Sequence, residues 1–272
     1  MIVILSDLHL GLPAAPTPAS LLPIVAGASE VILNGDAAES ASVAFAARGN
    51  NALAVFAEEA ARAGATVLRI EGNHDPGSGD LHAIRADGLA LVTHGHAFHP
   101  AIAPWSAAAP DVEAAFRHDF ESSVLEEPHR SLLAARAAAR RERELDHARK
   151  PSAVLRSMLA RPWAFPVVMG YWRIFPELSA RFAERTVPNA RIVASGHSHR
   201  AGAWMVRGRL VLNTGSFTFP GQPHAVTIDR QEVALVPLVR RGNEWRQDPS
   251  GRRAWRIEDV ARATASTSTP VS

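Results

Sequence analysis

The sequence of 272 residues contains no cysteine. Disulfide bonds, thiolate zinc sites and cysteine nucleophiles are therefore excluded, and packing must hold the fold together. No run of about 18 apolar residues occurs, because Arg156, Arg161 and Arg173 interrupt the most hydrophobic stretch, so we expect no membrane-spanning helix. The sequence also lacks Gly-x-Ser-x-Gly and Walker-type glycine-rich motifs. Their absence argues against a serine hydrolase of the elbow type and a P-loop nucleotide site.

The segment Met-Ile-Val-Ile-Leu-Ser-Asp at the start has no basic residue ahead of its apolar ones, unlike a signal peptide. We therefore expect a cytoplasmic location. Hydrophobic residues make up 47% of the chain and charged residues 21%, which is ordinary for a globular protein. One catalytic domain is predicted over residues 1–262, followed by a disordered tail over 263–272 that is small and polar.

Positive charge is concentrated in one region, although the formal net charge is only +2. Residues 130–200 contain fourteen basic and five acidic side chains, so the rest of the chain is net acidic. Such asymmetry indicates that this region meets an anionic substrate or surface.

Short runs of β-branched and aliphatic residues recur early in the chain, each followed by Gly, Asn, Asp or His. This pattern is typical of buried strands in an α/β sheet. Alanine-rich stretches at 19–27 and 52–64 predict helices between them. The predicted fold class is α/β, in which ligands gather at the carboxyl ends of strands. The predicted strands are 2–5, 31–33, 66–70 and 89–93.

A helical insertion is predicted at about 105–188, where the strand pattern disappears and Ala, Arg, Glu and Leu dominate. Its longest predicted helix is 131–148. Pro162, Pro166 and Pro176 are expected to break up the aromatic-rich part that follows. Strands are predicted again at 191–194, 203–206, 209–213, 225–228 and 232–237, with a tight hairpin turn at Arg207-Gly208.

Asp, His and Asn residues directly follow five of the predicted strands. Residues i and i+2 of an extended segment project to the same side, so Asp7 and His9 can hold one cation together. Each motif alone also fits an ordinary turn or a surface histidine. Their recurrence at five strand ends favours a metal site. The motifs are Asp7-Leu8-His9, Asn34-Gly35-Asp36, Gly72-Asn73-His74-Asp75, His94-Gly95-His96 and Gly196-His197-Ser198-His199.

In this order, the motifs resemble those of the calcineurin-like metallophosphoesterase superfamily: Asp-x-His, Gly-Asp, Gly-Asn-His-Asp/Glu, a single His and Gly-His-x-His. The resemblance covers residues 7–199. It implies a four-layer α/β/β/α sandwich and a dinuclear metal centre. It also implies a ligand set: Asp7, His9 and His199 for one metal, Asn73, His94 and His197 for the other, and Asp36 as the bridge.

The fourth motif leaves a choice between two histidines. His94 directly follows Val92-Thr93, where the family ligand lies, and is preferred. Whether His96 replaces or supplements it stays open. Glu39, three residues after the expected bridge, is expected to support the ligands rather than bind metal.

Imidazole, carboxylate and amide ligands suit two divalent cations, with Mn expected and Fe, Zn or Mg as alternatives. Two cations about 3.5–4 Å apart bind phosphate oxygens and activate a bridging hydroxide for in-line attack on phosphorus. His74 is expected to donate a proton to the leaving oxygen, with Asp75 orienting its ring. The resemblance therefore implies hydrolysis of a phosphoester or pyrophosphate bond.

The insertion is expected to select the substrate. Its arginines predict either a solvated, ion-paired helix or a cationic lid that contacts a membrane surface, with the aromatic segment as an apolar platform. The chain loosely resembles the UDP-2,3-diacylglucosamine pyrophosphatase branch, which implies a lipid-linked substrate at the inner membrane face. It departs from that branch at 35–39, which lacks bulky apolar residues, and at His96, where the branch has Asp. The basic residues in the insertion are Arg136, Arg140, Arg141, Arg143 and Arg149.

Three other functional classes remain as alternatives. The substrate could be a phosphorylated small molecule, or the enzyme could be a nucleotide or nucleic-acid phosphodiesterase, whose binding would weaken steeply with salt. A non-enzymatic scaffold on the same fold is the third. The complete set of predicted ligands, together with His74, argues against the scaffold.

Overall fold

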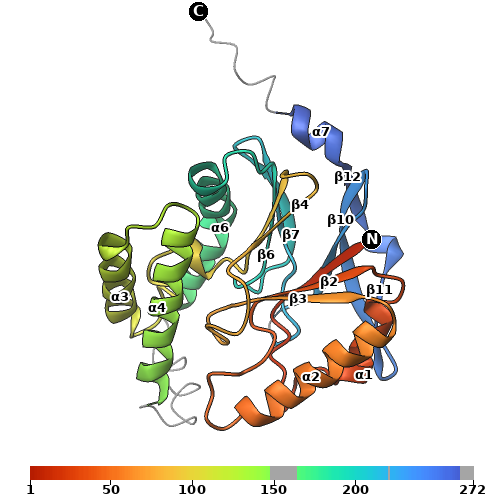
Figure 1. The fold of residues 1–272 in the computed structure, drawn as a ribbon, viewed down its shortest axis with the longest axis horizontal. Helices are drawn as coiled ribbons and strands as arrows, with labels where there is room; N and C mark the ends of the chain where they lie inside the picture. Colours follow the sequence, from red (N-terminus) through yellow and green to blue (C-terminus); the bar gives the residue numbers. More distant parts are fainter. Residues whose placement is uncertain (148–163, 220, 264–272) are drawn as a thin grey trace, which may run out of the picture.

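Two stacked β-sheets form the centre of the molecule, with helices on both outer faces (Figure 1). The computed structural model describes residues 1–147, 164–219 and 221–263. The arrangement confirms the predicted α/β class and the four-layer order. The expected tail, apart from Ala263, lies outside the described residues.

The first sheet has the order β11-β10-β9-β1-β2-β3, with β12 also paired to β10. β1, β2 and β3 run parallel, whereas β9 is antiparallel to β1. Their three carboxyl ends therefore lie at one edge of the sheet. The strands are β1 (Ile2–Leu5), β2 (Glu30–Asn34), β3 (Thr66–Ile70), β9 (His224–Ile228), β10 (Glu232–Arg241), β11 (Glu244–Gln247) and β12 (Arg253–Arg256).

The second sheet has the order β4-β5-β6-β8-β7. β5, β6 and β8 are parallel, and the two outer strands are antiparallel to their neighbours. The predicted turn between β7 and β8 is confirmed, and Arg207 and Gly208 both have positive φ, as the favoured two-residue hairpin turn requires. The strands are β4 (Ala83–Arg85), β5 (Ala90–Val92), β6 (Ile192–Ser195), β7 (Gly202–Val206) and β8 (Arg209–Asn213).

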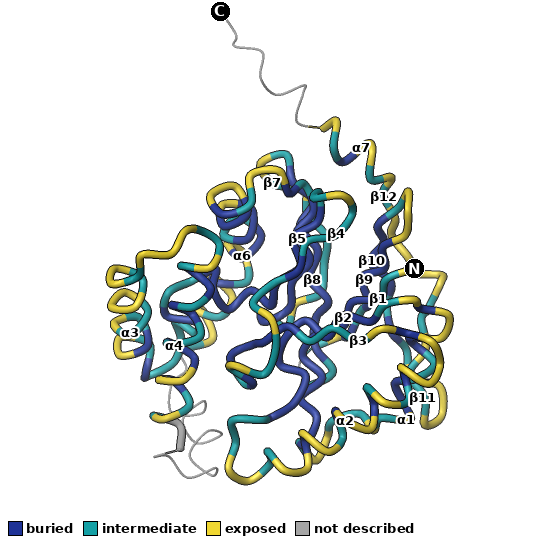
Figure 2. The backbone as a smooth tube through the Cα atoms, viewed as in Figure 1, coloured by how far each residue is buried: buried dark blue, intermediate teal, exposed yellow. Residues whose placement is uncertain are grey.

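Alternation along the strands divides the core into layers. In β1, Val3 and Leu5 pack toward the helices, while Ile4 packs between the two sheets. In β5, Leu91 instead faces the insertion helices. Successive side chains of a strand point to opposite faces of the sheet. Strands in which every residue is apolar, as the sequence shows, are therefore explained by burial on both faces. Figure 2 shows these strands as buried, with exposed residues gathered on the outer helices.

Helices α1 (Pro18–Leu21), η1 (Leu22–Ile24) and α2 (Ala46–Arg62) cover the first sheet, where Phe56 is fully buried. Thr17 caps α1 by accepting a hydrogen bond from the Ser20 backbone N–H, a favoured N-cap arrangement. Remaining short elements are η2 (His96–Phe98), η3 (Pro249–Gly251) and α7 (Ile257–Arg262). None of the helices in the described residues is long and apolar enough to cross a membrane.

The predicted insertion contains α3 (Ala109–Ser122), α4 (His129–His147) and α6 (Ala164–Thr186). The expectation that prolines break the aromatic segment was wrong for Pro166 and Pro176, which lie inside α6. Pro166 lies in the first turn, where backbone N–H groups have no helical partner. Pro176 is buried beside Phe175, and the Trp172 carbonyl four residues earlier, to which Pro176 cannot donate, accepts a hydrogen bond from Arg200 at 3.1 Å. Pro162 lies outside the described residues.

Candidate metal centre

All seven predicted metal ligands follow carboxyl ends of strands where the two sheets meet. Backbone hydrogen bonds join their loops: the Asp7 N–H donates to Gly35 O at 3.1 Å, and the Gly196 N–H donates to His94 O at 2.9 Å. Asn34 links the two sheets, because its side-chain amide donates to Thr93 O at 3.1 Å. The sequence motif indicated only a turn at Asn34.

Five of the predicted ligands adopt left-handed backbone conformations. Non-glycine residues in this region are rare and cost of order 1–3 kcal/mol each, so they persist only where the surroundings hold them. Such strain is typical of functional sites. The residues and their φ values are Asp7 (51°), His9 (48°), Asp36 (50°), His197 (65°) and His199 (57°).

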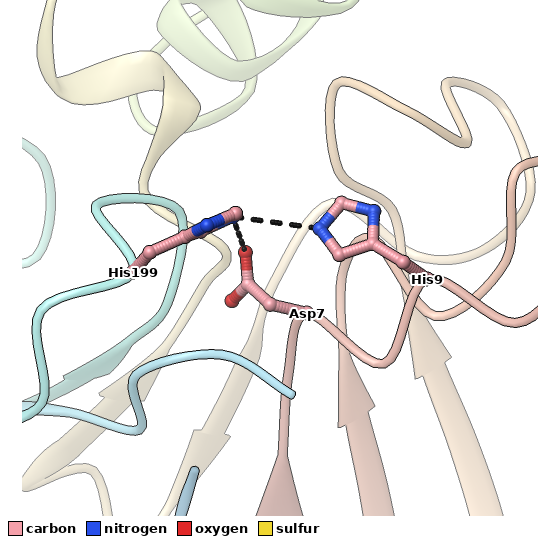
Figure 3. Close-up of side chains that lie close together, drawn as sticks. All are labelled: Asp7, His9 and His199. Carbon is pink, nitrogen blue, oxygen red and sulfur yellow. Dashed lines mark hydrogen bonds and ion pairs between the residues drawn. The ribbon is translucent and has the colours of Figure 1, made fainter. Parts of the chain in front are cut away.

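Asp7, His9 and His199 form a first group of ligand atoms that could hold a metal ion. The His199 Nε2 atom lies 3.1 Å from Asp7 Oδ1 and 3.4 Å from His9 Nε2. Figure 3 shows the two rings on either side of the Asp7 carboxylate, and their planes meet edge to face at 67°. These atoms come from residues about 190 positions apart in sequence, so only the folded chain assembles them.

A second group unites Asp7, Asp36 and His94. His94 Nε2 lies 3.2 Å from Asp36 Oδ2. His197 Nδ1 lies 3.1 Å from Asn73 Oδ1, which adds the remaining two predicted ligands beside this group. The two aspartates thus lie between the two sets of histidines.

The donor set fits divalent cations. Asp7 Oδ1 and His94 Nε2 are buried and have no hydrogen-bond partner among the described residues, yet both point at other ligand atoms. Buried polar atoms are normally hydrogen-bonded. Buried ligand atoms that converge without such partners therefore indicate that they share a cation. A mixture of imidazole nitrogen and carboxylate oxygen suits Mn, Fe or Zn.

The geometry favours His94 over His96 as the ligand of the fourth motif. The His94 Nδ1–H donates to Asn34 O at 2.9 Å, which turns Nε2 toward Asp36. The His96 ring lies 5.6 Å from that of His94, and His96 belongs to none of the metal-compatible groups found in the described residues.

Asp75 does not orient the His74 ring as expected. Its carboxylate accepts backbone N–H groups of Gly72, Asp36 and Ala37, at 2.6, 3.1 and 3.0 Å. A short carboxylate directly after a tight turn reaches the neighbouring backbone more easily than the next side chain. Asp75 thus fixes the loop that carries Asp36.

The carboxylate of Glu39 contacts the rings of both His74 and His9. Its Oε1 lies 2.7 Å from His9 Nδ1 and its Oε2 lies 3.1 Å from His74 Nδ1. A carboxylate on one ring nitrogen directs the other nitrogen toward a metal or substrate. Glu39 therefore has the supporting position predicted for it. It also contacts the His74 ring, the contact that was expected of Asp75.

The electrostatics of the pocket favour a positive charge between its carboxylates. Burial lowers the pKa of His94, but Asp36 and Asp7 outweigh burial and raise it to about 10. Burial opposes ionisation of Asp7, yet His94 and His199 bring its pKa to about 2. His197, buried and beside the His94 charge, has its pKa lowered to about 3, so it remains a neutral imidazole.

Glycines beside the motifs allow the ligands to pack closely. A Cβ on Gly72 would collide with the carboxylate of Asp36, and one on Gly196 would collide with Ser6 and Asp7. Only glycine permits such an approach.

Two charged residues of the basic helix α4 reach the centre, a contact that the sequence did not predict. Glu142 Oε2 accepts a hydrogen bond from the Asn73 side-chain amide at 3.2 Å. The side-chain NH1 of Arg143 lies 3.5 Å from His74 Nδ1. Helix α4 is held by Arg136, which pairs with the buried Glu71 at 2.8 Å. The basic helix therefore has inward-facing charges, with exposed pairs such as Arg141–Glu144 on its outside.

The sequence matches the family model described as the calcineurin-like phosphoesterase superfamily domain over residues 1–233. The chain belongs to this superfamily. Among curated proteins, none matches the sequence.

The solved structures to which the chain is similar include one predicted phosphoesterase and two Vps29 proteins. A conserved uncharacterised protein, a predicted phosphoesterase from Streptococcus pneumoniae TIGR4, is 17% identical, with 94% of this chain and 96% of that chain covered and a TM-score of 0.40. A Vps29 double mutant from Entamoeba histolytica is 14% identical, with 93% and 98% covered and a TM-score of 0.47. Chaetomium thermophilum Vps29 is 12% identical, with 94% and 96% covered and a TM-score of 0.44.

Proposed function

We propose that this calcineurin-like phosphoesterase is a dinuclear metal-dependent hydrolase of phosphoester or pyrophosphate bonds. The observation that carries the proposal is the convergence of ligand atoms from four strand ends into two adjoining groups that share Asp7, with Asn73 from a fifth strand end beside His197. Asp7, His9 and His199 would hold one metal, and Asn73, His94 and His197 the other. Asp36 would lie between them as the bridge.

When bound, two divalent cations would polarise the phosphoryl oxygens and lower the pKa of an attacking water. Mn is the cation we expect, with Fe, Zn or Mg as alternatives. His74 supplies the proton for the leaving oxygen in this proposal. Its Nδ1 faces Glu39, so Nε2 is the nitrogen that can reach a substrate. Its backbone N–H also donates to Asp36 Oδ1 at 2.8 Å, which fixes its distance from the centre.

The test is metal analysis combined with turnover of a panel of phosphomonoesters, phosphodiesters, nucleotides and single-stranded oligonucleotides by Mn-loaded protein. We expect two metals per chain and hydrolysis of at least one ester class. A protein that binds no metal and hydrolyses none of them would be a scaffold, which contradicts the proposal. The matched control is Asp36→Asn, which removes the bridging charge and should abolish turnover.

A second candidate is hydrolysis of a lipid-linked substrate at a membrane surface. It is favoured by the start of α6, where four large apolar side chains lie exposed within ten residues: Phe165, Val167, Met169 and Ile174. Exposed apolar residues on a helix beside basic ones are typical of interfacial contact. Sedimentation with vesicles containing anionic lipid tests it: Phe165→Ser should reduce binding, and equal binding would reject this candidate.

A further inference from the structure

A cavity of about 330 Å³ adjoins the metal centre. His199, a proposed ligand, forms part of its wall, together with Trp172 of α6 and Arg253 of β12. The cavity therefore lies between the insertion, the last ligand loop and the C-terminal strands. His199 also contacts Asp7, so the cavity lies directly next to the first metal-compatible group.

The lining of the cavity is cationic. It contains Arg200, Arg253 and two histidines, and no Asp or Glu. None of the carboxylates in the described ranges forms an ion pair with either arginine. Their neighbours behave differently, since Arg252 pairs with Glu232 and Arg207 with Glu184. Two guanidinium groups whose charge is not neutralised at the wall of a hollow create a site for an anion.

Aromatic rings and backbone oxygens hold these arginines without cancelling their charge. The Arg200 guanidinium lies 5.7 Å from the Trp204 ring centroid and donates to Trp172 O at 3.1 Å. The guanidinium of Arg253 lies 5.3 Å above the Trp255 ring. Such cation–π contacts position the side chain and leave N–H donors for a ligand.

The wall next to the ligands is fixed by a hydrogen bond. Trp172 Nε1 donates to Ser198 O at 2.7 Å, so α6 is tied to the loop between His197 and His199. A ligand group in the cavity is thereby held at a constant position relative to the metal centre.

We propose that this cavity binds a second phosphate group of the substrate, held by Arg200 and Arg253, while the metal centre holds the phosphorus that is attacked. The inference rests on the proposed function and narrows it to substrates with two phosphate groups. Arginine is suited to phosphate because its planar donors match two oxygens at once. Because no carboxylate lines the cavity, nothing there repels an anion. A neutral leaving group would make no ion pair with Arg200 or Arg253.

The experiment compares AMP, ADP and adenosine 3′,5′-bisphosphate with Mn-loaded wild type, Arg200→Gln, Arg253→Gln and the control Arg246→Gln. Arg246 lies on β11 and pairs with Glu244 outside the cavity. We expect kcat/KM to be higher for a doubly phosphorylated nucleotide than for AMP. This preference should fall about tenfold in either cavity variant and remain in Arg246→Gln. ADP and the bisphosphate distinguish adjacent from separated phosphates.

Binding provides a readout that does not need turnover. The probe is adenosine 5′-(α,β-methylene)diphosphate, compared with AMP by calorimetry on the metal-loaded protein. Loss of the diphosphonate preference in Arg253→Gln, with metal content unchanged, supports the cavity even if Arg200→Gln disturbs the adjacent His199.

The outcomes separate the two proposals. Hydrolysis with the same preference in all variants would overturn the cavity and leave the proposed function standing. Arginine-dependent binding of the diphosphonate without hydrolysis of any ester would overturn the proposed function alone.

Discussion

The side-chain amide of Asn73 donates a hydrogen bond to Glu142 across 3.2 Å, and this contact joins the insertion to the metal centre. Glu142 is buried on α4. With its amide nitrogen held in this way, Asn73 turns its carbonyl oxygen toward His197. Helix α4 thus orients one of the predicted metal ligands.

Glu142→Ala should therefore weaken metal binding, because the Asn73 amide loses the acceptor that sets its orientation. We expect a loss of affinity of about 10- to 100-fold, as is typical for residues that support ligands. Glu142→Gln keeps an acceptor oxygen and should lose less. Glu144→Ala, on the exposed side of the same helix, is the control. Metal titration calorimetry that gives one affinity for all four proteins would contradict the orientation argument.

His74→Ala should lower turnover by roughly 100- to 10,000-fold, the range typical of lost acid–base catalysis. Metal content should stay at the wild-type level, because His74 is not in the proposed ligand set. Steady-state kinetics and elemental analysis measure the two effects. His118→Ala, an exposed histidine on α3, is the control. Unchanged turnover in His74→Ala would remove this residue from the mechanism.

Metal binding should strengthen as the pH rises. In the metal-free protein the carboxylates of Asp36 and Asp7, outweighing burial, hold the pKa of His94 at about 10, so His94 carries a proton at neutral pH. A cation binds only the neutral imidazole and must displace this proton. Apparent affinity should then rise by about tenfold per pH unit for each proton released. Calorimetry in buffers of different ionisation enthalpy measures the release, and a pH-independent affinity would contradict the prediction.

Gly196→Ala should destabilise the protein and disturb the metal centre, because the added Cβ collides with Ser6 and Asp7. Overpacking of this kind costs about 1–3 kcal/mol. The matched control is Gly170→Ala in α6, where a Cβ meets nothing within 4 Å. There we expect stabilisation of about 0.5–1 kcal/mol from the reduced chain entropy of the unfolded state. Chemical unfolding of both variants tests the difference, and equal stabilities would show that the Gly196 backbone can shift.

The strands of the centre could be predicted because their signal is local. An apolar run such as 2–5 is buried on at least one face wherever it lies, and the prediction matches β1 residue for residue. β11 and β12 were missed because Trp, Arg and Glu alternate there on a largely exposed edge. An exposed strand forms through its pairing with β10, which no short window contains.

The types and order of the candidate ligands were determined by the sequence, because each motif ends a strand and parallel strands end at one edge. The tertiary structure alone decided which groups touch. Glu39 rather than Asp75 reaches His74, since the short Asp75 carboxylate is used by three backbone N–H groups. It also decided that Glu142 meets Asn73 and that Arg200 and Arg253 share one cavity. The Glu39–His74 and Glu142–Asn73 contacts join residues 35 and 69 positions apart, and chain packing, not local preference, sets them.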